Sequence, residues 1–149
     1  MFDIHIEEFY FDCCKTLTTL YQNFPKKCAV FVEDISGQDQ PDEYGVHSDR
    51  FLSCFGAMVW LADEGYLQYE STIRQEAIDQ ATLSSKGLHL LANIAHNESI
   101  NAITEKVYPA LPGLKGQPTI ETLKHLMKHG TSSQLGLAMQ YLLGKHSST

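Results

Sequence analysis

Residues 48–91 constrain the fold more than any other part of this chain. Residues 49–64 are apolar on most sides, as in a helix buried within a domain. Ser48 stands directly before them, and its hydroxyl can accept a hydrogen bond from a backbone N–H at the start of a helix. Gly65 follows them, and glycine readily adopts the left-handed conformation that ends helices. The pattern therefore predicts one long helix with a clear start and a clear end.

The chain after this helix has the pattern of two paired strands. Residues 66–69 include two tyrosines, residues 76–82 include Ile78 and Thr82, and residues 70–75 form a polar connection between the two segments. Ser84 can cap a second helix, which we expect to continue through Ile94. Paired strands flanked by helices predict an α+β domain with a small antiparallel sheet.

Two phrases in this segment resemble a known fold. LADEGYL at residues 61–67 and ATLSSKGLHLLA at residues 81–92 resemble the second half of winged-helix domains of the multiple-drug-resistance (MarR) and PadR regulator kind. In that family the helix ends in a similar glycine phrase, two wing strands follow, and a second glycine phrase opens the next helix. The resemblance implies a winged-helix-like fold with its wing at about 66–82, and it implies duplex DNA as a ligand.

The front of the chain follows the winged-helix order except at one element. That order is helix, short strand, second helix, recognition helix and two wing strands. Residues 6–24 predict the first helix, and residues 28–32 predict the strand. Residues 34–48 are rich in glycine, aspartate and glutamine, so they predict a loop. A single turn at residues 41–44 is all that we allow for the second helix, so the winged-helix-like domain predicted over residues 1–95 lacks that element.

The rest of the chain, residues 96–149, predicts a helical appendage. Helices are expected at 99–108, 119–129 and 132–144, and residues 109–118 form a linker rich in proline and glycine. The last two helices carry apolar faces that must be covered by the core or by a second subunit. Appended helices serve dimerisation in many proteins of the resembled kind, which favours a homodimer.

The composition indicates an ordinary folded protein. The chain has 149 residues, of which 43% are hydrophobic and 19% are charged. No apolar run approaches the length of about 20 residues that spans a membrane. The acidic start, MFDIHIEEFYFD, differs from a signal peptide, and the four cysteines include no CxxC pair. These features predict a cytoplasmic protein with free thiols and no membrane contact.

The charge distribution disfavours a nucleic-acid partner. The formal net charge is −7, and residues 1–48 carry three lysines against nine acidic residues. Residues 92–149 carry five lysines against three acidic residues. Duplex binding draws its affinity from neutralising phosphates, and an acidic front with a mildly basic tail provides little of this.

One stripe of the helix at residues 49–64 is the candidate interaction face. It carries Arg50, Ser53, Ala57 and Trp60, with Arg74 in the predicted wing nearby. Reading bases requires Arg, Lys, Asn or Gln near the helix start and basic residues around it. Arg50 alone meets that requirement, and the wing carries more acidic than basic residues. The stripe therefore favours a protein partner, with a duplex-reading helix as the alternative.

Trp60 is the only tryptophan, and it lies on this stripe opposite the face of Leu52, Phe55 and Val59. A large ring among small and polar residues is either covered by another part of the chain or offered to a partner. We expect the C-terminal helices to cover it in the first case. In the second case it anchors an intermolecular contact.

Three other groups of residues have ordinary structural explanations. His125 and His129 share a helix face, but no third metal ligand is evident, so we expect solvated side chains. Cys13 and Cys14 lie within a helix among aromatic and acidic residues, which favours packing over reactivity. The acidic loop at residues 33–43 matches no calcium-binding spacing. We predict no metal, no cofactor and no catalytic residue.

These observations predict a non-catalytic winged-helix-like protein that serves as a protein-interaction or regulatory module. The alternative is a DNA-binding transcriptional regulator of the winged-helix kind. An enzyme of unknown type is the third hypothesis, and the sequence provides no catalytic motif in its favour.

Overall fold

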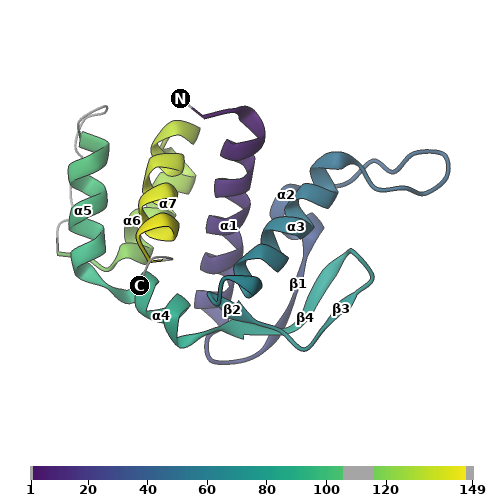
Figure 1. Ribbon diagram of the computed structural model, residues 1–149, viewed down its shortest axis with the longest axis horizontal. Coiled ribbons are helices and arrows are strands. Elements are labelled where there is room, and N and C mark those ends of the chain that lie inside the picture. The colour runs from purple at the N-terminus through teal and green to yellow at the C-terminus, as the bar shows by residue number, and fades with distance from the viewer. Residues whose placement is uncertain (1, 106–115, 147–149) are drawn as a thin grey trace.

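The first helix, α1 (Ile4–Asn23), lies between the two halves of the fold (Figure 1). The sheet, α2 (Val32–Ser36) and α3 (Asp49–Asp63) pack on one side, and the C-terminal helices pack on the other. The structure is a computed structural model, and it describes residues 2–105 and 116–146. Because α1 meets both halves, its buried residues cover several of its sides, among them Cys13, Leu17 and Leu20. The predicted helix 6–24 is confirmed, and it begins two residues earlier.

A small antiparallel sheet is organised around β4 (Ala77–Leu83). β1 (Cys28–Phe31) pairs with one of its edges and β2 (Leu67–Gln68) with the other, while β3 (Ser71–Ile73) pairs with its first half. The predicted pairing of the two strands after the long helix is confirmed, and so is the α+β fold class.

β3 forms within the connection that was predicted as a turn. The Glu70 N–H donates to the Asp79 carbonyl at 3.0 Å, which carries the pairing past the end of β2. The turn is therefore shorter than predicted, and it contains Arg74, which has φ of 52°. The antiparallel pairing extends closer to the tip of the hairpin than the sequence pattern indicated.

The second helix is present, which corrects the predicted loop at 34–48. α2 (Val32–Ser36) begins directly after β1, so the predicted strand 28–32 ends one residue early. Val32 and Ile35 are both buried, and their spacing of three residues places them on one face of this short helix. Five residues are too few to show a periodic pattern. The turn allowed at residues 41–44 occurs as an isolated turn, with the Gly45 N–H donating to the Asp42 carbonyl at 2.9 Å.

The two helix starts predicted from serines are confirmed. α3 (Asp49–Asp63) is capped by the Ser48 hydroxyl, which accepts a hydrogen bond from the Phe51 N–H at 3.2 Å. α4 (Ser85–Ala92) is capped by the Ser84 hydroxyl, which accepts from the Gly87 N–H at 3.1 Å. Gly65 ends α3 with φ of 85°, as expected for a left-handed residue.

Asn93 divides the helix that was predicted to run from Ser84 through Ile94. α4 ends before it, and α5 (Ile94–Glu105) begins after it, earlier than the predicted start at residue 99. The extended backbone of Asn93 lets its carbonyl accept from the Thr119 N–H and hydroxyl, at 3.1 and 2.6 Å. This contact joins segments 26 residues apart, so the local sequence pattern could not indicate it. The end of the predicted helix 99–108 and most of the predicted linker 109–118 lie outside the described residues.

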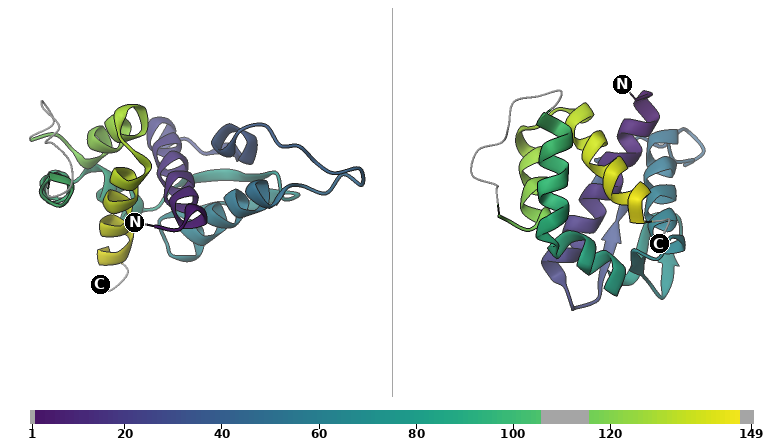
Figure 2. Two further views of the ribbon diagram at one scale, coloured as in Figure 1. Left: turned by 90° about the horizontal axis from the view of Figure 1, so that it is seen from above. Right: turned by 60° about the vertical axis from the view of Figure 1, so that its left-hand side comes forward.

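α6 (Thr119–His129) and α7 (Ser132–His146) pack against α1 (Figure 2). Their buried residues include Ile120, Leu123, Leu126, Ala138 and Leu142. These residues belong to the same core cluster as those of α1 and α3. The apolar faces of these two helices are thus covered within one chain, and they do not by themselves require a second subunit.

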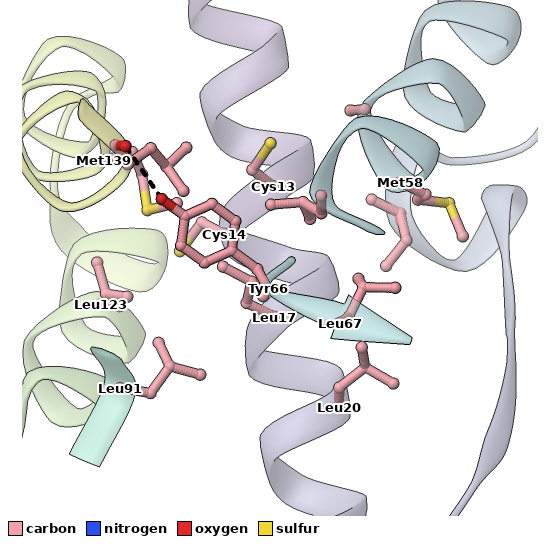
Figure 3. Close-up of a cluster of buried hydrophobic side chains, with 14 of the residues drawn as sticks. Cys13, Cys14, Leu17, Leu20, Met58, Tyr66, Leu67, Leu91, Leu123 and Met139 are labelled. Atoms are coloured by element: carbon pink, nitrogen blue, oxygen red, sulfur yellow. Dashed lines mark hydrogen bonds between the residues drawn. The ribbon is translucent and has the colours of Figure 1, made fainter. Parts of the chain in front are cut away.

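Tyr66 lies at the centre of this core (Figure 3). Its side chain is fully buried, and its hydroxyl donates to the Leu143 carbonyl of α7 at 3.0 Å. The hydrogen bond ties the end of α3 to the C-terminal helix. In the part of the chain that the structure describes, no helix has both the length and the apolar character needed to cross a membrane.

Candidate functional site

Arg50, the first residue of the predicted interaction stripe, is held by carboxylates of α1. Its guanidinium donates two hydrogen bonds of 2.7 Å to Asp12 and lies 2.8 Å from Glu8. The side chain of Asp12 is only 1% exposed, and that of Arg50 is 31% exposed. The hydrogen bonds to Asp12 raise the pKa of Arg50. The Arg50 guanidinium is therefore committed to this chain and is not presented to a base or a phosphate.

Ala57 and Trp60 are also turned toward the rest of the chain. Ala57 is 2% exposed, so it belongs to the core and not to an open surface. Trp60 is half-buried, with its ring edge-on to Phe9 at 5.1 Å and stacked on Tyr66 at 6.4 Å. Helix α1 therefore covers part of the Trp60 ring. The sequence had predicted that the C-terminal helices would cover it.

The other two residues of the predicted face lie apart from these. Ser53 is exposed on α3, and Arg74 is 86% exposed at the tip of the β3–β4 hairpin. Arg74 is 3.9 Å from Glu76, a weak surface ion pair. The structure therefore does not gather the five predicted residues into one surface, because three of them contact neighbours in the core or in α1.

The open side of α3 is formed by a different set of residues. Ser53 and Gly56 lie at its middle, with Asp49 and Asp63 exposed toward its two ends. A Cβ added to Gly56 would meet no atom within 4 Å, so space beyond it is open. Partly buried apolar side chains lie beside this line, namely Leu52, Phe55 and Val59, and the first two of them also pack against the core. We call these seven residues the α3 outer face.

Helical periodicity alone could not separate the two sides of α3. Apolar residues occur nearly all round this helix, so a rotation of one or two positions fits the sequence equally well. The orientation of α3 depends on Asp12 of α1, which binds the Arg50 side chain and turns it toward α1. Asp12 and Arg50 are 38 residues apart, so no local pattern indicates this contact.

The two glycine phrases meet at the junction between α3 and α4. The Ser84 N–H donates to the Tyr66 carbonyl at 3.1 Å, and the Ser84 hydroxyl donates to the Gly65 carbonyl. Gly87 packs directly above, where a Cβ would lie 2.0 Å from the Tyr66 carbonyl oxygen. Lys86 donates to the Glu64 carbonyl at 3.0 Å. The residues of both glycine phrases therefore form a single site at which two backbone segments pass close to each other.

The acidic loop holds itself together through its own backbone and the start of α3. Asp39 accepts from the Ser48 hydroxyl at 2.6 Å and contacts His47 at 2.7 Å. Burial tends to raise the pKa of Asp39, but the hydrogen bonds from Ser48 and His47 prevail and hold it below its ordinary value. The stability that Asp39 contributes through these hydrogen bonds is fully present when the pH is above the ordinary aspartate pKa. It is lost as the pH falls through the lowered pKa of Asp39. Asp42 accepts from the Tyr44 and Val46 N–H groups, both at 2.9 Å.

The cysteines carry free thiols, and most of them are buried. Cys13, Cys14 and Cys54 are buried free thiols, and Cys28 is half-buried. Burial raises the pKa of Cys54 to about 12, so its thiol stays protonated at neutral pH. His125 and His129 share a face of α6 with ring centroids 5.0 Å apart. Among the residues placed by the structure, no three metal-ligating side chains come together.

Replacing the half-buried tryptophan tests whether its ring belongs to the core. Trp60→Ala is expected to lower the free energy of unfolding by about 3 kcal/mol, because the contacts with Phe9 and Tyr66 are lost. Ser53→Ala on the exposed side of the same helix should change it by less than about 0.5 kcal/mol. Urea unfolding followed by circular dichroism measures both. A Trp60→Ala chain of unchanged stability would show that the ring makes no core contact.

Comparison with protein-family models, with curated proteins and with solved structures found no match for this chain.

Proposed function

We propose that this chain is a non-catalytic winged-helix-like protein that serves as a protein-interaction or regulatory module. The order of its elements supports the winged-helix part of the proposal. Helix, strand, short helix, helix and three strands follow one another from α1 to β4, and the first two of these strands pair with the third. The junction of Gly65, Tyr66, Ser84 and Gly87 adds a physical reason for the two phrases that resemble this family.

The observation that carries the interaction part is the chemistry of the α3 outer face. α3 precedes the two paired strands, which is the place of the recognition helix in the resembled family. A reading helix needs donors that match base edges, and phosphates repel carboxylates. The α3 outer face instead has two carboxylates, a serine, a glycine and three partly buried apolar side chains. Apolar area rimmed by polar groups is typical of a protein-binding surface.

We take a second copy of this chain as the first partner to test, bound through the α3 outer face and not through α6 and α7, whose apolar faces are covered within one chain. The α3 outer face can be blocked without disturbing the fold at Gly56, where the space beyond the helix is open. Light scattering of the intact chain is expected to give twice the chain mass of 16.7 kDa. Gly56→Arg should return it to the mass of one chain, because a long charged side chain would stand in the middle of the contact.

A matched variant and a contrary outcome complete this test. Gln140→Arg adds the same charge at an exposed position of α7, away from the α3 outer face, and should leave the dimer intact. A chain that scatters as a monomer at every concentration would remove self-association from the proposal. A dimer that Gly56→Arg leaves unchanged would place the contact elsewhere.

The DNA-binding regulator is the alternative, and Arg74 is the observation in its favour. This side chain projects from the tip of the hairpin, where a wing would meet a phosphate backbone. A mobility assay against random duplex at low and moderate salt separates the two proposals. Salt-sensitive binding that weakens in Arg74→Ala would favour the regulator, since phosphate contacts release counterions. Absence of binding at low salt would favour the interaction module.

A further inference from the structure

A groove between α1 and α6 gathers positive charge in a protein that is otherwise acidic. It has a volume of about 810 Å³, and residues of both helices line it. Three of the eleven lysines and arginines of the chain line it, together with two histidines and a single acidic residue. These residues are Lys15, Lys124, Lys128, His125, His129 and Glu121. Figure 2 shows the two helices from directions in which their neighbouring positions can be followed.

The acidic residues of α1 do not neutralise this groove. Asp12 and Glu8 bind Arg50 on the side facing α3, and Glu7 accepts a hydrogen bond from Ser133 of α7. Glu121 is the one carboxylate of the lining, and its contact with Lys124 is a long 4.0 Å. Lys15 and Lys128 form no ion pair with any residue in the described ranges 2–105 and 116–146. The groove therefore keeps most of its positive charge.

Two lysines of α6 are neighbours on the surface of this helix. Lys124 and Lys128 are four residues apart. Residues at this spacing are neighbours on a helix surface, and like charges there repel each other. The repulsion between positive side chains around one groove is reduced when an anion binds between them.

The groove also has an apolar part. Phe11 and Met127 contribute to its lining, and the Lys15 ammonium group lies 5.8 Å from the centre of the Phe11 ring. Gln22 adds an amide donor. The lining thus combines several donors with a ring and a thioether, and its volume falls within the range of about 300–1,000 Å³ usual for small-ligand sites.

We propose that this groove binds a small organic phosphate, with the phosphate group among Lys15, Lys124 and Lys128 and the organic part against Phe11 and Met127. A phosphate monoester matches the lining because it carries two negative charges and several acceptor oxygens. The histidines can donate further hydrogen bonds to it. This site is separate from the α3 outer face and does not depend on the interaction proposed there.

The test uses phenyl phosphate as the probe, with inorganic phosphate and phenol for comparison, all at constant ionic strength. Amide resonances of residues 15–22 and 121–129 should shift saturably with phenyl phosphate. Inorganic phosphate should bind roughly tenfold or more weakly, because it lacks the group that contacts Phe11 and Met127. Phenol should produce no saturable shift in these residues, since it carries no phosphate.

A pair of charge-matched variants tests the lysines. Lys124→Glu with Lys128→Glu should weaken phenyl phosphate binding by roughly tenfold or more. Lys26→Glu with Lys27→Glu makes the same change of net charge at exposed positions outside the groove and should leave binding within about twofold. Circular dichroism checks that both double variants keep the fold. Equal losses in the two variants would show general charge attraction and overturn the site.

Two further outcomes would overturn the proposal. The first is a lack of any saturable shift with phenyl phosphate. The second is tighter binding of a decaglutamate peptide or of random duplex DNA, if the Lys124→Glu, Lys128→Glu variant abolishes it. The groove would then be a surface for an acidic macromolecule and not a small-ligand site.

Discussion

Gly87→Ala is expected to lower the free energy of unfolding by about 3 kcal/mol, near the upper end of the cost of overpacking. The added Cβ would lie 2.0 Å from the Tyr66 carbonyl oxygen and 3.2 Å from a methyl group of Leu83. The Tyr66 carbonyl cannot move away cheaply, because it accepts the Ser84 N–H and belongs to a fully buried residue. Urea unfolding monitored by circular dichroism measures the loss.

Gly56→Ala is the matched control, because it makes the same substitution within another helix, and it is measured at a concentration at which light scattering gives the mass of one chain. No atom lies within 4 Å of a Cβ added there, so the alanine meets open space. Alanine restricts the unfolded chain more than glycine does and favours the helix, so stability should rise by about 0.5–1 kcal/mol. Opposite signs for the two variants are the expected result. A neutral Gly87→Ala would mean that α4 does not approach Tyr66 as closely as described.

Arg50→Met is expected to lower the free energy of unfolding by about 3 kcal/mol. The carboxylate of Asp12 is 1% exposed, and the substitution would leave it buried without the two hydrogen bonds of 2.7 Å that it now accepts. We take the lower end of the usual range for a broken buried pair, because Arg50 itself is partly exposed to water.

The double variant Asp12→Leu with Arg50→Met should recover most of this loss. Replacing both partners by apolar side chains removes the buried charge along with its partner. Arg74→Met is the control, and it should change stability by less than about 0.5 kcal/mol, because Arg74 is 86% exposed. A double variant as unstable as Arg50→Met alone would show that the pair contributes more than mutual neutralisation.

The elements predicted correctly are those whose signals are local. Serine caps indicated the starts of α3 and α4, Gly65 indicated the end of α3, and the segments on either side of the polar connection 70–75 indicated the paired strands. α2 was missed because it has five residues, and two buried side chains do not make a period. The break at Asn93 was missed because its carbonyl is satisfied by Thr119, far along the chain.

The candidate site was harder to predict than the fold. The stripe containing Arg50, Ala57 and Trp60 has the right helical spacing. Spacing shows which residues share a face of the helix, but it does not show which face points into the core. Their true orientation depends on Asp12 and Phe9 of α1, and no local pattern links these to α3. The groove between α1 and α6 was missed for the same reason, since its two lysine-bearing walls are a hundred residues apart in the sequence.

Helix α1 lines the groove, and it also supports α3, the helix that carries the other surface to which we assign binding. Phe9 and Asp12 support α3 from one side of it, and Lys15 lines the groove from another, less than two turns further along. An α-helix is stiff over such a distance, so a shift of α1 at the groove would alter the packing beneath Trp60. Occupancy of one surface would then change the affinity at the other, and by thermodynamic linkage the effect would be equal in both directions.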